Sequence, residues 1–102
     1  MGLHLHCCLL GRVYQEGGEH PTWDWLRYDG DREFWDFLCD TEGMLDSTLG
    51  SDGECYHRPA DIARAKAWVL ATFPEKHFPQ IRLLHLLGIL DLEPTYWLYA
   101  SM

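Results

Sequence analysis

The chain contains no asparagine and only eight basic side chains, and both shortages exclude classes of function. Without asparagine there is no acceptor for N-linked glycosylation. Eight bases against sixteen acids cannot build the clustered positive surface that binds phosphate, so we expect neither direct nucleic-acid binding nor binding to an anionic membrane. Long apolar runs are also missing, and none approaches the length that crosses a bilayer.

Acid is abundant, and most of it lies in one block, residues 16–54. This block holds twelve acids against Arg27 and Arg32, a net charge of −10 in a chain whose total is −8. Charge this one-sided bears on partners rather than on fold. The natural partner is a basic protein surface, including that of a nucleic-acid-binding protein whose groove can be blocked. Six of the chain's aromatic side chains lie in the same block: Trp23, Trp25, Tyr28, Phe34, Trp35 and Phe37.

Four cysteines are present, but their spacing has none of the regularity of a disulfide scaffold. Cys7 and Cys8 are adjacent, so on a strand they point to opposite faces and suit burial better than mutual bridging. We therefore expect reduced thiols and a cytoplasmic protein.

The pattern of apolar residues predicts a single small α+β domain over residues 1–102, since so short a chain builds one core. We expect a sheet of two to four strands that pairs the two terminal strands and is covered by about three helices. Residues 43–54 are expected to be the longest loop. Helices are expected over 32–40, 59–72 and 79–90, and strands over 3–14, 55–57 and 95–100.

Local signals support these elements. Asp31 is expected to cap the first helix, whose inward stripe is Phe34, Phe37 and Leu38. Pro59 is expected to be the first residue of the second helix. Residues 55–57 are expected to form an edge strand.

The leading interpretation is a non-enzymatic binding module, of the inhibitor, immunity or anti-defence type, that docks on a basic protein. Acids would steer and orient the partner, and exposed aromatic side chains would anchor it. The predicted partner-binding residues are Trp23, Asp24, Tyr28, Asp29, Asp31, Glu33, Trp35 and Asp36. The plainer interpretation makes the aromatics core and the acids ordinary solvated surface.

Two alternatives stay open. His4, His6, Cys55 and His57 have the spacing that puts each pair on one face of a strand, and together they supply the ligands of a tetrahedral zinc site. Such a domain would be metal-binding or enzymatic, although no nucleophile elbow or phosphate-binding loop is present. A homo-oligomer that buries the aromatics in its own interface is the other alternative. We predict no catalytic residue and no cofactor other than this alternative zinc.

Overall fold

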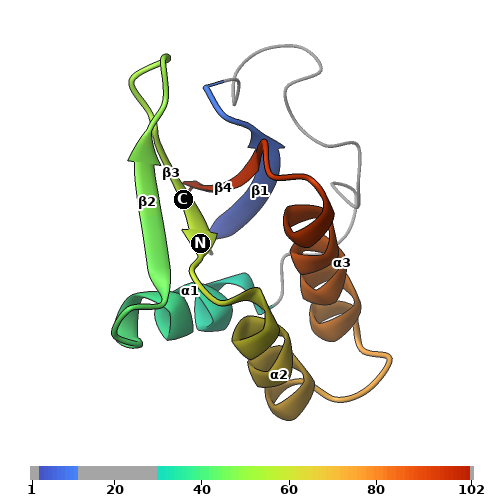
Figure 1. Cartoon of the computed structure of the whole chain (residues 1–102). Coiled ribbons are helices and arrows are strands. Elements are labelled where there is room, and N and C mark those ends of the chain that lie inside the picture. Colours follow the sequence, from blue (N-terminus) through green and yellow to red (C-terminus); the bar gives the residue numbers. More distant parts are fainter. Residues whose placement is uncertain (1–2, 12–29, 102) are drawn as a thin grey trace.

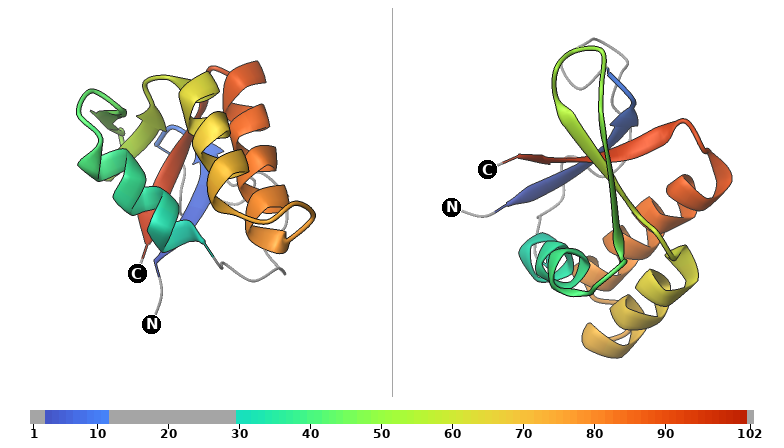
Figure 2. Two further views of the ribbon diagram at one scale, coloured as in Figure 1. Left: turned by 90° about the horizontal axis from the view of Figure 1, so that it is seen from below. Right: turned by 60° about the vertical axis from the view of Figure 1, so that its left-hand side comes forward.

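Four strands and three helices make up the described part of the chain, which in this computed structural model is residues 3–11 and 30–101. The strands form one antiparallel sheet in the order β1-β4-β3-β2. The helices lie against one face of that sheet (Figures 1 and 2). In chain order the elements are β1 (His4–Leu9), α1 (Asp31–Asp40), β2 (Leu45–Leu49), β3 (Cys55–Pro59), α2 (Ile62–Thr72), α3 (Phe78–Leu92) and β4 (Tyr96–Ser101).

The two terminal strands pair with each other, as the sequence predicted. β1 and β4 are antiparallel with Cys7 opposite Leu98, and both side chains are buried in the core beneath the helices. Alternation along β1 sends Cys8 to the other face of the sheet, where it is also fully buried. The α+β fold, with the terminal strands in one small sheet under three helices, is thus confirmed.

Two features of the sequence favour helix α1: an apolar stripe along one face and a suitable residue at its N-cap. Phe34 and Leu38 lie one turn apart and are buried, while Phe37 is only partly buried. The predicted cap is corrected: Gly30 is the N-cap and Asp31 is the first helical residue. Gly30 has a φ of 91°, and a Cβ there would lie 2.9 Å from Pro79, so both the backbone angle and the space require glycine.

The segment predicted as the longest loop is a β-hairpin instead. Residues 45–49 are strand β2, which pairs with β3 from Leu49 opposite Cys55 to Leu45 opposite Pro59. The Gly50 N–H donates to the Glu54 carbonyl over 2.8 Å and closes the turn. β3 is consequently an interior strand, and β2 is the edge (Figure 1).

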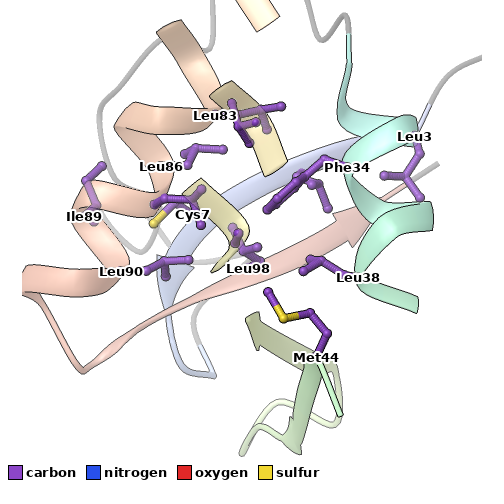
Figure 3. Close-up of a cluster of buried hydrophobic side chains, with 14 residues drawn as sticks. Leu3, Cys7, Phe34, Leu38, Met44, Leu83, Leu86, Ile89, Leu90 and Leu98 are labelled. Atoms are coloured by element: carbon purple, nitrogen blue, oxygen red, sulfur yellow. The ribbon is translucent and has the colours of Figure 1, made fainter. Parts of the chain in front are cut away.

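The second helix also begins later than predicted. Pro59 ends β3, and Asp61 caps α2 by accepting a hydrogen bond from the Arg64 N–H at 3.0 Å. α3 begins at Phe78 with a proline in its first turn, close to its predicted start. Figure 3 shows the core where the helices meet the sheet, with Leu98 of β4 near its centre.

Candidate functional site

The eight predicted partner-binding residues fall into two groups. Trp23, Asp24, Tyr28 and Asp29 lie outside the described residues. The other four, Asp31, Glu33, Trp35 and Asp36, all belong to α1. Glu33 and Asp36 are exposed, and Trp35 is half-buried.

Asp31 differs from its neighbours because it is not on the surface. Its side chain is fully buried and accepts hydrogen bonds from the Leu5 N–H at 2.8 Å and from Arg82 Nη1 at 2.5 Å. Arg82, itself 3% exposed, also donates to the Leu5 carbonyl at 2.6 Å. Asp31 is therefore removed from the predicted docking surface, and its role in this structure is to hold α1 and α3 against β1.

Burial raises the pKa of Asp31 to about 6, although the Arg82 charge and the Leu5 N–H act in the opposite direction. The carboxyl group is therefore mainly ionised at neutral pH. Leu5 presents its N–H and carbonyl to this ion pair rather than to a neighbouring strand. The pair thus supplies hydrogen bonds at the outer side of β1.

The acids that remain on the outside form what we call the acidic surface of α1 and the hairpin. All of its members are exposed. Arg32 is the one base within residues 31–54, and it pairs with Asp36 at 3.3 Å with both side chains more than half exposed. Such a surface pair contributes little to stability. The acidic surface comprises Glu33, Asp36, Asp40, Glu42, Asp46 and Asp52.

The pKa of the Cys39 thiol is affected by the negative charge on α1. Its thiol is free and exposed, and its pKa is raised, first by partial burial and then by Asp40 and Asp36. A raised pKa leaves less of the nucleophilic thiolate at neutral pH, so this cysteine is a poor nucleophile. The shift also means that these two carboxylates disfavour an additional negative charge here and favour a positive one.

Trp35 connects α1 to the hairpin. Its ring meets the His57 imidazole of β3 edge-on, with ring centroids 4.8 Å apart. The Nδ1 atom of His57 lies 2.7 Å from the Ser47 hydroxyl of β2. Burial lowers the pKa of His57, so the ring is neutral at neutral pH. Trp35 also packs against the hydrophobic core and is half-buried, so part of its side chain is accessible to solvent.

The four residues of the zinc alternative do not converge. His4 and His6 share a face of β1, as their spacing predicts, with ring centroids 6.4 Å apart. In the sheet register His6 is opposite Tyr99, while His57 is opposite Leu98, which is in the core. Adjacent residues of β4 point to opposite faces, so the two histidine sites lie on opposite sides of the sheet. Across the described ranges no group of three or more His, Cys, Asp or Glu residues is arranged to hold a metal ion.

No disulfide joins the four cysteines, all of which lie in the described ranges. Cys7 and Cys8 are buried, and Cys39 and Cys55 are exposed. Within residues 3–11 and 30–101, no helix has both the length and the apolar character needed to cross a membrane.

Comparison of the chain with protein-family models, with curated proteins and with solved structures finds no match in any of the three. Arguments about function therefore rest on the geometry of this chain alone.

Proposed function

We propose that this protein is a non-enzymatic binding module, of the inhibitor or immunity type, that docks on a basic protein surface through the acidic surface of α1 and the hairpin. The observation that carries the proposal is the position of Trp35. Its ring packs against His57 and against the core but is only half-buried, and the exposed Glu33 and Asp36 belong to the same helix. Tryptophan is favoured as a binding anchor, and surrounding charge gives orientation and speed.

The charge distribution supports the same reading. Six exposed acids lie on α1 and the hairpin, and Arg32 is already engaged by Asp36. The remaining described elements carry bases and acids in comparable number, since five bases and four acids follow residue 54. The excess negative charge of the described residues is therefore concentrated in residues 31–54, and such an excess can steer a basic partner.

The contact between Ser47 and His57 is the observation that favours an enzymatic alternative, since a hydroxyl beside a neutral imidazole is how nucleophilic serines are activated. In a serine nucleophile site a third group orients the histidine, and backbone donors receive the oxyanion. Among the described residues, the ring partner of His57 is Trp35, and no carboxylate there hydrogen-bonds to it. We therefore interpret the Ser47–His57 pair as a bond that stabilises the hairpin.

Charge reversal tests the proposal. Short random peptides displayed on phage are selected on the immobilised protein, and we expect the enriched peptides to be rich in lysine and arginine. Asp36→Lys should then weaken the binding of a synthetic enriched peptide about five-fold, because a weak attraction becomes a repulsion. Asp46→Lys should do the same from the hairpin. Binding is measured by fluorescence anisotropy of the labelled peptide.

Glu75→Lys is the matched control, because it makes the same change of charge at an exposed position between α2 and α3. We expect it to change the affinity by less than about two-fold. Enrichment of neutral or acidic peptides, or an equal loss in all three variants, would contradict the proposed function.

A further inference from the structure

The two edge strands of the sheet differ in what their outward backbone groups contact. β1 and β2 are the outer strands, and the backbone of β1 meets Asp31 and Arg82 at Leu5. In the described part of the chain no strand lies beyond β2, and Figure 1 shows it as the outermost strand on its side of the sheet. An uncovered edge presents unpaired N–H and carbonyl groups that pair readily with another extended chain.

The hydrogen bonds of the hairpin show which backbone groups point outward. Gly50 donates to the Glu54 carbonyl at one end of β2, and Ala60 donates to the Met44 carbonyl over 2.7 Å at the other. Inward-facing residues alternate along an antiparallel strand, so even-numbered residues from 44 to 50 face β3. Leu45, Ser47 and Leu49 therefore direct their N–H and carbonyl groups away from the sheet.

The exposure of β2 agrees with an available edge. Leu49 is 71% exposed although it is a large apolar side chain, and Ser47 is also exposed. Asp46 projects from the opposite face of the same strand, opposite Arg58 in the register. β2 contains neither proline nor lysine, two residues that commonly hinder pairing at an exposed edge.

We propose that an extended, basic segment of a partner protein binds to β2 as an additional strand of the sheet. This inference rests on the proposed function and specifies how the partner binds. Charge decides the occupant: pairing two copies through β2 brings two acidic hairpins together, whereas a basic segment meets Asp46 and the neighbouring Glu42 with opposite charge.

The geometry also defines the sequence of that segment. Side chains of an added strand alternate between the two faces of the sheet. Those on the face of Asp46 should be lysine or arginine, and those on the face of Leu45 and Leu49 should be apolar. Binding peptides should therefore show basic and apolar residues in alternation, and proline should be absent from their paired positions.

The test compares two substitutions at one residue. Leu49→Pro removes an outward N–H that the fold does not use, whereas Leu49→Ala shortens the same side chain and keeps the N–H. For a synthetic peptide enriched by the selection described above, we expect Leu49→Pro to weaken binding about five- to ten-fold and Leu49→Ala to weaken it by less than about two-fold. Circular dichroism and thermal melting check that both variants are folded.

A second measurement leaves the protein unchanged. Methylation of the backbone nitrogens along one edge of the peptide should abolish binding, while methylation along the other edge should have little effect. Basic peptides that bind but tolerate methylation on either edge, and bind Leu49→Pro as tightly as Leu49→Ala, would overturn strand addition and leave the proposed function standing. A selection that enriches no basic peptide would remove both. A native dimer by sedimentation that Leu49→Pro converts to monomer would also overturn this inference, because a second copy would then occupy the edge.

Discussion

Arg82→Met should destabilise the protein by about 3–5 kcal/mol, because it leaves a buried carboxylate without its counter-charge. Asp31 is fully buried, and Arg82 forms an ion pair with it. The same substitution removes the donor to the Leu5 carbonyl, so a backbone acceptor also loses its partner. The loss is a large fraction of the stability of a domain of this size. Urea unfolding followed by circular dichroism measures it.

Arg64→Met is the control for this prediction. Arg64 is exposed on α2, so the same replacement there should change the free energy of unfolding by less than about 0.5 kcal/mol. An Arg82→Met variant as stable as the native protein would show that the ion pair does not hold α1 and α3 to β1.

Leu98→Ala should cost about 2–5 kcal/mol of unfolding free energy, the range for truncating a buried leucine to alanine. Leu98 is completely buried on β4, opposite Cys7 on one side and His57 on the other. Figure 3 places it near the centre of the cluster of buried side chains, so the surroundings cannot collapse fully into the space. Thermal unfolding should show a lower midpoint, by about 4–8 °C for each kcal/mol.

Leu92→Ala provides the comparison, since Leu92 is 82% exposed at the end of α3. We expect a change below about 0.5 kcal/mol. Equal losses in the two variants would contradict the assignment of the core to the space between the helices and β4.

Much of the fold could be predicted because its elements carry local signals. The stripe of Phe34 and Leu38 marks α1, and the aromatic and apolar residues near the end of the chain mark β4. The hairpin was missed because the glycines and serines of residues 43–54 are typical of loops. The signal that could have found it is short: Leu45 and Leu49 lie on one face of a five-residue run between glycines, next to a predicted strand.

The candidate site was harder to predict, because its main contacts join distant parts of the sequence. Asp31 and Arg82 are 51 residues apart, and the acids of α1 are indistinguishable in sequence from a solvated helix face. One clue was available: Arg82 stands alone among the leucines of a helix that is apolar nearly all round, and a buried cation needs an acidic partner. Trp35 was predicted as an anchor, but its contact with His57 depends on how α1 crosses the sheet.

We propose that stability and binding depend on the two opposite edges of one sheet. At β1, an internal ion pair supplies hydrogen bonds that a neighbouring strand would otherwise make. At β2, no strand of residues 3–11 or 30–101 pairs with the outward groups of Leu45, Ser47 and Leu49, and we propose that the acids nearby favour a basic occupant. In this proposal, charge selects the partner, and hydrogen bonds to the backbone of β2 determine where the partner binds.

The most direct test of the central claim is the rate at which a selected basic peptide associates with the native protein as ionic strength rises. Screening by salt reduces attraction between exposed charges, so the association rate constant should fall by about ten-fold or more between about 10 mM and 500 mM salt. The dissociation rate constant should change much less, and Asp36→Lys should flatten the dependence. An association rate constant that is independent of salt would contradict docking through the acidic surface of α1 and the hairpin.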